Sequence, residues 1–263
     1  MNIEQRELYL NLLIKVLLNT IYEDPNLHGH KFSAAIRDQG RDWPCLAHTM
    51  VGRARLENLK ELMQRTVDEG VPGDYIETGV WRGGCCILMR GVLAANLEKS
   101  RKVYVADSFA GLPRPNSELY PWDACYASVN YTELAVSLEQ VKENFAKYDL
   151  LGDQVIFVRG LFKDTLPALQ AGPFALIRLD GDYYESTIQA LEALYPKVSQ
   201  GGFVVIDDYG IASCREAVND YRRLHNIDEP LSSVDWTGVW WQKGALSAPI
   251  VSLSEADCVD PMS

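Results

Sequence analysis

Phe174-Ala175-Leu176-Ile177-Arg178-Leu179 is a short run with a single charged residue, and the acidic stretch Asp180-Gly181-Asp182 follows it directly. Similar apolar runs recur along the chain, and segments with helical periodicity separate most of them. These runs lie at 74–77, 102–106, 155–158, 203–206 and, late in the chain, 239–241. Short strands that are apolar along their whole length and alternate with helices are typical of a mostly parallel sheet covered on both faces. Because crossovers are right-handed, we expect an α/β fold with a doubly wound sheet.

The 263 residues divide into three parts. Residues 1–70 predict a helical N-terminal extension, with helices over 4–22 and 53–69 and a long polar loop over 23–50 that is typical of a lid. Residues 71–244 predict the α/β domain, with helices over 85–97, 132–147, 164–169, 184–195 and 214–225. Residues 245–263 form a small, polar and acidic tail, which we expect to be poorly ordered.

Charge and composition exclude several classes of protein. The net charge is −11 and the pI is about 4.9, which argues against nucleic acid and against an anionic membrane surface as partners. No apolar run reaches the roughly 18 residues of a membrane-spanning helix, and the acidic start is unlike a signal peptide. The six cysteines form no CxxC pair and predict reduced thiols. We therefore expect a cytoplasmic protein that handles a small molecule.

Acidic residues follow four of the five principal apolar runs. The residues at these ends are Glu77, Asp107, Gly160, Asp180 and the pair Asp207-Asp208. Ligands of open parallel sheets bind beyond the carboxyl ends of the strands. The pattern therefore predicts an acidic binding site at that edge of the sheet.

The first of these ends begins the loop Glu77-Thr78-Gly79-Val80-Trp81-Arg82-Gly83-Gly84. This loop differs from the dinucleotide-binding fingerprint, because Trp81 stands where backbone must approach a pyrophosphate. Glu77 would also repel a phosphate, whereas it would attract a cationic amino-acid end. Asp107 is placed to accept hydrogen bonds from both ribose hydroxyls of a nucleoside. Together these features indicate S-adenosylmethionine, although a tight turn with a helix-capping acid remains an alternative.

The candidate cofactor-binding residues lie at these strand ends and in the loops that follow them. They are Glu77, Thr78, Gly79, Arg82, Gly83, Asp107, Ser108, Gly160, Phe162 and Asp180.

A second acidic cluster combines Asp180 and Asp182 with Asp207 and Asp208. Neighbouring strands lie about 4.8 Å apart, so three of these carboxylates can converge on one point. Oxygen ligands without histidine or cysteine favour Mg²⁺, with Mn²⁺ or Ca²⁺ as substitutes. The alternative is that the acids cap the helices that follow them.

These motifs in combination resemble the macrocin O-methyltransferase family. The resemblance rests on the first loop, on Ala106-Asp107-Ser108-Phe109, on Asp180-Gly181-Asp182 and on Ile206-Asp207-Asp208-Tyr209, and it extends over nearly the whole chain before the tail. It implies a class I methyltransferase (Rossmann-like) fold that uses S-adenosylmethionine and Mg²⁺ to methylate sugar hydroxyls of macrolide and aminocoumarin antibiotics. It places the metal ligands on Asp180, Asp207 and Asp208 and the catalytic base on Asp182.

The resemblance also implies that the N-terminal segment forms a lid and contacts of a homodimer or higher homo-oligomer, with Tyr9, His48 and Met50 near the entrance of the site. We therefore predict an O-methyltransferase whose acceptor is a glycosylated small molecule. Five aromatic residues are candidates for the acceptor pocket or for ordinary surface and core positions: Tyr120, Trp122, Tyr126, Tyr131 and Tyr183.

Three other functions remain open at this point. A metal-dependent glycosyltransferase also uses a D-x-D motif such as Asp180-Gly181-Asp182, although Glu77 and the second acidic pair argue against it. A catechol-type O-methyltransferase shares the metal chemistry. A non-catalytic dimer would bind the cofactor without transferring a methyl group.

Overall fold

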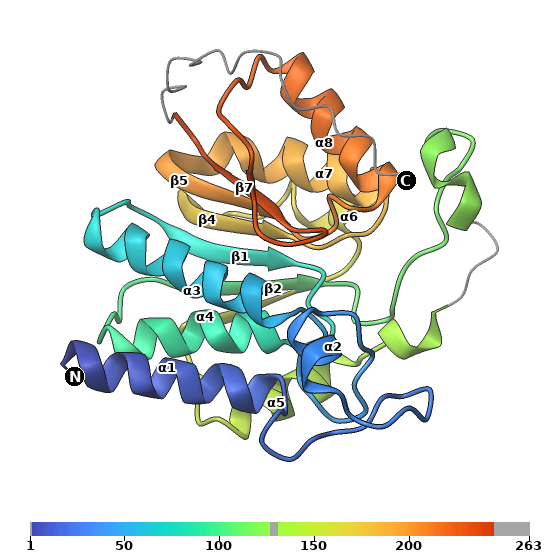
Figure 1. Cartoon of the computed structure of the whole chain (residues 1–263). Helices are drawn as coiled ribbons and strands as arrows, with labels where there is room; N and C mark the ends of the chain where they lie inside the picture. The colour runs from blue at the N-terminus through green and yellow to red at the C-terminus, as the bar shows by residue number, and fades with distance from the viewer. Residues whose placement is uncertain (1, 127–130, 245–263) are drawn as a thin grey trace, which may run out of the picture.

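The computed structural model describes residues 2–126 and 131–244. Its centre is a seven-stranded sheet with the order β3-β2-β1-β4-β5-β7-β6 (Figure 1). The strands are β1 (Asp74–Thr78), β2 (Val103–Asp107), β3 (Val155–Arg159), β4 (Phe174–Leu179), β5 (Val198–Ile206), β6 (Ser232–Ser233) and β7 (Val239–Gln242). β1 to β5 pair in parallel, and β7 runs antiparallel to β5 and to β6. The predicted doubly wound α/β sheet is confirmed.

The predicted helices occur in the expected order with some shifted ends, and one further short helix, over 34–38, lies within the segment that was expected to be a loop. They are α1 (Ile3–Leu17), α2 (Ala34–Asp38), α3 (Arg53–Asp68), α4 (Gly84–Ala95), α5 (Leu138–Ala146), α6 (Phe162–Thr165), α7 (Tyr184–Leu194) and α8 (Ala212–Leu224), with short 3₁₀ helices η1 (Pro121–Tyr126), η2 (Thr132–Leu134) and η3 (Tyr195–Lys197).

Three of the predicted helices were too long, and the one expected over 164–169 ends at Thr165 as α6. The first ends at Leu17 instead of Tyr22, because Asn19 adopts a left-handed backbone with φ of 51°. The helix expected over 132–147 is interrupted by extended backbone at Ala135, and α5 begins only after Ser137, whose side chain accepts a hydrogen bond from the backbone N–H of Gln140.

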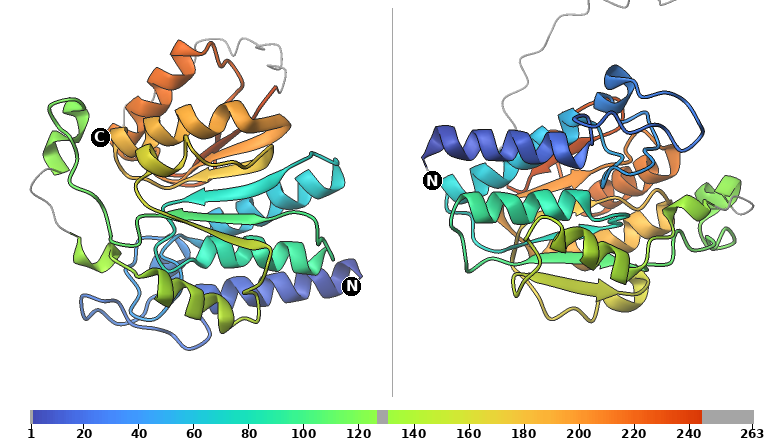
Figure 2. Two further views of the ribbon diagram at one scale, coloured as in Figure 1. Left: turned by 180° about the vertical axis from the view of Figure 1, so that it is seen from behind. Right: turned by 90° about the horizontal axis from the view of Figure 1, so that it is seen from below.

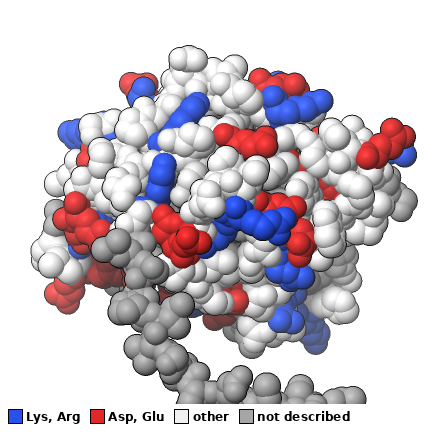
Figure 3. All heavy atoms as spheres, turned by 90° about the horizontal axis from the view of Figure 1, so that it is seen from above, with Lys and Arg blue, Asp and Glu red and all other residues white. Residues whose placement is uncertain are grey.

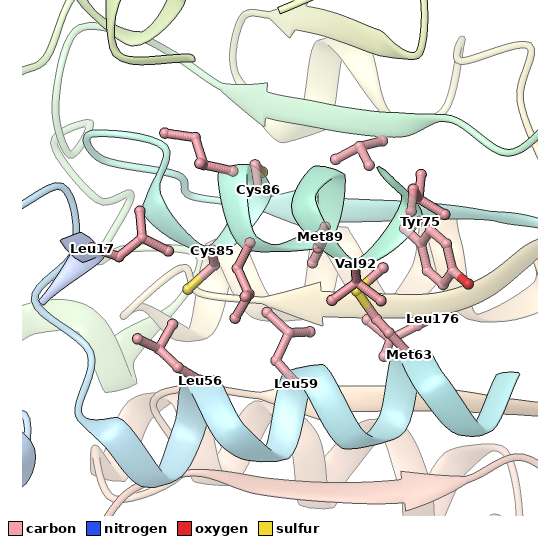
Figure 4. Close-up of a cluster of buried hydrophobic side chains, with 14 of the residues drawn as sticks. Leu17, Leu56, Leu59, Met63, Tyr75, Cys85, Cys86, Met89, Val92 and Leu176 are labelled. Atoms are coloured by element: carbon pink, nitrogen blue, oxygen red, sulfur yellow. The ribbon is translucent and has the colours of Figure 1, made fainter. Parts of the chain in front are cut away.

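The strands bury alternate side chains on the two faces of the sheet. Tyr75 and Val105 face a core shared with α1, α3, α4 and α5, whereas Ile76 and Tyr104 face a core shared with α7 and α8. Figure 2 shows these two helical layers from behind and from below. Figure 4 shows Leu56 and Leu59 of α3 packed against Cys85 and its neighbours on α4, so the N-terminal helices share the core of the sheet.

The long N-terminal loop is held by one buried arginine. Arg37 is only 1% exposed, and its guanidinium donates hydrogen bonds of 2.7 Å to the carbonyl oxygens of Leu18 and Asp24 and to the carboxylate of Asp42. Since a buried guanidinium is stable only with its donors satisfied, Arg37 fixes the path of residues 18–42.

A second excursion, over 108–126 and 131–137, projects beyond the carboxyl ends of the strands (Figure 1). Asp123 of η1 is fully buried and accepts hydrogen bonds from the backbone N–H groups of Tyr184 and Glu185, at distances of 2.8 and 2.9 Å. It thus caps the start of α7 from a distant part of the chain and fastens the excursion to it.

The structure also shows the distribution of surface charge and the state of the cysteines. Figure 3 shows acidic and basic side chains interspersed on one face. The five cysteines of the described ranges (Cys45, Cys85, Cys86, Cys125 and Cys214) are all free. No helix among the described residues is long and apolar enough to cross a bilayer. The expectation of a poorly ordered tail concerns residues 245–263, which lie outside the described residues.

Candidate active site

A cavity of about 700 Å³ opens at the carboxyl ends of the parallel strands. Glu77 lies one residue before the end of β1, Asp107 ends β2, and Asp180 and Asp207 directly follow β4 and β5. All four residues line the cavity. Its volume lies in the usual range of sites for small molecules and cofactors. The strand-end acids that the sequence singled out therefore share one cavity.

Gly79 brings the first loop against the end of β4. Its φ is +79°, and a Cβ at this position would lie 1.7 Å from the backbone oxygen of Asp180. No side chain fits there, so the loop and Asp180 approach each other as closely as their backbones allow. This close approach places the β1 and β4 ends of the cavity side by side.

The rest of the first loop supports the N-terminal segment. Arg82 donates hydrogen bonds to the carbonyl oxygens of Ala47 (2.8 Å) and Pro44 (3.2 Å). A Cβ on Gly84 would lie 2.4 Å from the carbonyl oxygen of His48. Thr78, Arg82 and Gly83 are absent from the cavity lining within the described chain, whereas Glu77 and Gly79 belong to it. The absence of a side chain on Gly84 thus lets the backbone at His48 approach the start of α4.

The second loop holds its carboxylate with backbone donors. Asp107 accepts hydrogen bonds from the N–H groups of Val80 (2.7 Å) and Phe109 (2.8 Å), and burial nonetheless raises its pKa above the ordinary value. Ser108, Gly160 and Phe162 line the cavity beside it. These contacts fix the orientation of Asp107 at the cavity wall.

The carboxylates of Asp180, Asp207 and Asp208 converge as predicted from the strand spacing. Each offers an oxygen atom, and these atoms all lie within 4.8 Å of one another. The backbone N–H of Asp182 donates a 3.0 Å hydrogen bond to Asp208, which ties the two acidic loops together.

The helix-capping alternative does not account for the acids. The residues at the N-caps of α7 and α8 are Tyr183 and Ile211, and neither helix start has a side-chain cap from its own N-cap residue. Asp123 instead accepts hydrogen bonds from the first two backbone N–H groups of α7.

Two arginines that sequence reasoning missed lie among these acids. Arg178 of β4 is 2% exposed and forms ion pairs with Glu77, Asp207 and, at 2.8 Å, Asp180. Arg55 of α3 forms ion pairs with Asp207 and, at 3.0 Å, Asp235. The available signal for Arg178 was its charge inside an otherwise apolar run.

The cluster nevertheless holds more negative than positive charge. Four carboxylates pair with the two guanidinium groups, those of Glu77, Asp180, Asp207 and Asp235, and two further carboxylates, those of Asp182 and Asp208, lie near Asp180 and Asp207. Burial and the neighbouring carboxylates raise the pKa of Asp180 to about 6 and that of Asp182 to about 7. Oxygen ligands with this excess of negative charge fit a hard divalent cation at Asp180, Asp207 and Asp208.

Four aromatic residues also line the cavity. Trp43, Tyr126, Tyr131 and Tyr183 line it, with the Trp43 and Tyr131 rings stacked at 6.0 Å and the Tyr126 and Tyr183 rings 5.1 Å apart. Together they give the cavity an apolar wall.

The other aromatic candidates lie elsewhere. The Tyr120 ring packs on Tyr184 at 5.9 Å, and the half-exposed Trp122 is outside the lining formed by the described residues.

The three residues expected near the entrance of the active site lie in three different environments. Met50 lines the cavity, while Tyr9 packs on the core between α1 and α4. His48 hydrogen-bonds through Nδ1 to the Tyr148 hydroxyl at 2.7 Å.

His48 predicts a pH dependence of stability. Burial, followed by the charges of Lys147 and Arg82, lowers its pKa to about 4. A histidine in an unfolded chain has a pKa near 6.5. Between about pH 6.5 and 4, His48 is therefore protonated in the unfolded state but not in the folded state. The His48 contribution to the free energy of unfolding should therefore fall as pH is lowered through this window, while carboxyl groups with a raised pKa, such as Asp182, contribute with the opposite sign. Urea unfolding at several pH values should show that His48→Asn gains stability relative to the wild type as pH falls, and that His28→Asn, which alters an exposed ring, keeps a constant difference from the wild type.

Comparison with known proteins places the chain in a family. The family described as Macrocin-O-methyltransferase (TylF) matches residues 26–243. The chain belongs to this family. It is therefore an O-methyltransferase with a class I fold, and the glycosyltransferase and non-catalytic alternatives are set aside.

Two curated relatives are about half identical to this methyltransferase. One is the 8-demethyl-8-(2,3-dimethoxy-alpha-L-rhamnosyl)-tetracenomycin-C 4'-O-methyltransferase of Streptomyces olivaceus, 50% identical over 93% of this chain and 96% of the relative. Another is the demethyldecarbamoylnovobiocin O-methyltransferase of Streptomyces niveus, 49% identical over 90% of this chain and 93% of the relative. The solved structure of the O-methyltransferase NovP matches with a TM-score of 0.87 at 48% identity, over 90% of this chain and 99% of that one.

Proposed function

We propose that this O-methyltransferase methylates a sugar hydroxyl of a glycosylated natural product, with S-adenosylmethionine as methyl donor and Mg²⁺ as metal. The observation that carries the proposal is the convergence of Asp180, Asp207 and Asp208 in the cavity beside the Gly79 loop. Its support is the similarity, at 50% identity over 93% of this chain, to an enzyme whose name describes O-methylation of a rhamnosyl-tetracenomycin.

The cofactor would lie along the ends of β1 and β2. S-adenosylmethionine supplies the methyl group on a positively charged sulfur. In this proposal Glu77 attracts the ammonium group and Asp107 accepts hydrogen bonds from the ribose hydroxyls, with Gly79 and Gly160 in the cavity wall beside them. Arg82 shapes this site indirectly, because it holds the lid segment from behind.

Asp180, Asp207 and Asp208 would hold the metal ion. Mg²⁺ bound by carboxylates at this position would lower the pKa of a neighbouring sugar hydroxyl and fix its orientation. Asp182 lines the same cavity, and burial raises its pKa to about 7, where a carboxylate is an effective general base. We assign Asp182 as the group that accepts the hydroxyl proton.

Residues 1–70 would act as a lid and as the contact between two copies. Trp43, Thr49 and Met50 line the cavity. On the outer side of α1, Leu8, Leu12 and Val16 recur every fourth residue and are 73%, 52% and 37% exposed. An apolar stripe of this kind fits a homodimer. The free thiols fit the reducing conditions of the cytoplasm.

The test combines binding with an acceptor panel. We expect calorimetry to show binding of S-adenosylhomocysteine and no binding of UDP. With labelled S-adenosylmethionine and Mg²⁺, we expect methyl transfer to desmethyl sugars of glycosylated polyketides and aminocoumarins, and loss of transfer in EDTA. Transfer to the matching aglycones or to a catechol, but to no glycoside, would contradict the proposed acceptor class. Full transfer in EDTA would contradict the metal.

A further inference from the structure

We propose that Arg55 is a positioning residue that holds Asp207 in the cation-free protein and releases this carboxylate when a divalent cation binds. The inference rests on the proposed function, because it assumes a cation at Asp180, Asp207 and Asp208. Arg55 comes from α3 in the N-terminal extension, lines the cavity and has a side chain that is 9% exposed.

Both carboxylate oxygens of Asp207 are engaged by guanidinium groups. Oδ1 accepts a hydrogen bond from Nη2 of Arg178, and Oδ2 accepts one from Nη1 of Arg55. A magnesium ligand oxygen lies about 2.0–2.1 Å from the ion, so a cation on Asp207 would face these two positive groups at short range. Repulsion of this kind disfavours simultaneous occupancy unless one of the arginines moves.

Arg178 is the arginine that cannot move. It is 2% exposed, and its three carboxylate partners lie at the carboxyl-terminal ends of three adjacent strands. Withdrawing it would leave Glu77 without its counter-ion in the interior, which is strongly destabilising.

Arg55 has a second set of partners within reach. Its Nε lies 3.0 Å from Oδ2 of Asp235, an ion pair that lacks the alignment of a hydrogen bond. Its guanidinium carbon also lies 5.9 Å from the centre of the Trp236 ring. Arg55 can therefore leave Asp207 and strengthen its contact with Asp235 while it remains paired.

Asp235, the second partner of Arg55, lies in a turn over 235–238 that forms part of the cavity wall. Oδ1 of Asp235 accepts hydrogen bonds from the N–H groups of Thr237 (3.0 Å) and Gly238 (2.8 Å), and the Thr237 hydroxyl donates to the backbone oxygen of Asp207. Trp236 lines the cavity and donates through Nε1 to the carbonyl oxygen of Gln39. Asp235 is thus held in place to accept Arg55.

The test is a direct titration with Mn²⁺, followed by the electron paramagnetic resonance signal of the free ion. We expect Arg55→Gln to bind Mn²⁺ at least tenfold more tightly than the wild type, because the internal competitor is gone. In EDTA the same variant should unfold at a lower temperature, because Asp207 loses a counter-ion. Arg53→Gln is the matched control: it lies two residues earlier on α3, pairs with Asp38, and should leave the Mn²⁺ affinity unchanged.

Asp235→Asn tests where Arg55 goes. Removing the receiving charge should weaken Mn²⁺ binding in the wild-type background and have little effect in the Arg55→Gln background, which is a double-mutant cycle. Equal or weaker Mn²⁺ binding by Arg55→Gln, beside a wild type that does bind, would overturn the role of Arg55 alone. Absence of Mn²⁺ binding by the wild type and by both variants would overturn the metal site and this inference together.

Discussion

Replacing Asp182 by Asn should lower kcat by about 10²- to 10⁴-fold, the usual contribution of a general base. The amide has the same shape but cannot accept the hydroxyl proton. Asp182 has a φ of 59°, a conformation that Asn also tolerates, so the loop should keep its course. Steady-state kinetics with a saturating acceptor measures the loss, and calorimetry with S-adenosylhomocysteine should show unchanged cofactor binding.

Asp164→Asn provides the control for this substitution. Asp164 is exposed on α6, and removing its charge there should leave kcat within about twofold of the wild type, as is usual for a surface substitution. A kcat for Asp182→Asn within about fivefold of the wild type would refute the base assignment. Loss of S-adenosylhomocysteine binding would instead show that Asp182 serves the cofactor.

The sheet could be predicted because its strands carry a strong local signal. β1 to β4 and the second half of β5 are short, mainly apolar runs, and the acids at the ends of four of these strands reach one cavity because parallel strands end at the same edge. β6 has only two residues, Ser232 and Ser233, and its position depends on pairing with β7 across the turn that Asp235 holds. No local pattern marks such a strand.

The two arginines of the site were missed because their partners are distant in sequence. Arg55 pairs with Asp207, 152 positions away, and Arg178 pairs with Glu77, 101 positions away. Asp123 likewise caps a helix that begins 61 positions later. Charge and residue type predicted which carboxylates lie close together, but only the tertiary structure shows which arginines pair with them.

Replacing the buried Arg178 should have the largest effect on the free energy of unfolding. We expect Arg178→Met to lower the free energy of unfolding by about 3–5 kcal/mol, because it leaves Glu77, Asp180 and Asp207 without their shared partner in the interior. Arg223→Met is the control, since Arg223 has an exposed side chain with one partner, Asp220, and such pairs contribute about 0–1 kcal/mol. Urea unfolding in EDTA measures both.

A second substitution distinguishes unpaired charge from lost packing. If repulsion among the carboxylates causes the loss, Glu77→Gln should recover part of it in the Arg178→Met background, although the same change in the wild type breaks an ion pair and destabilises. If the packing of the long side chain is what matters, Glu77→Gln should add to the loss in both backgrounds. Arg178→Lys retains the charge without the planar fork and should lie between the wild type and Arg178→Met, since one ammonium group cannot reach all three carboxylates.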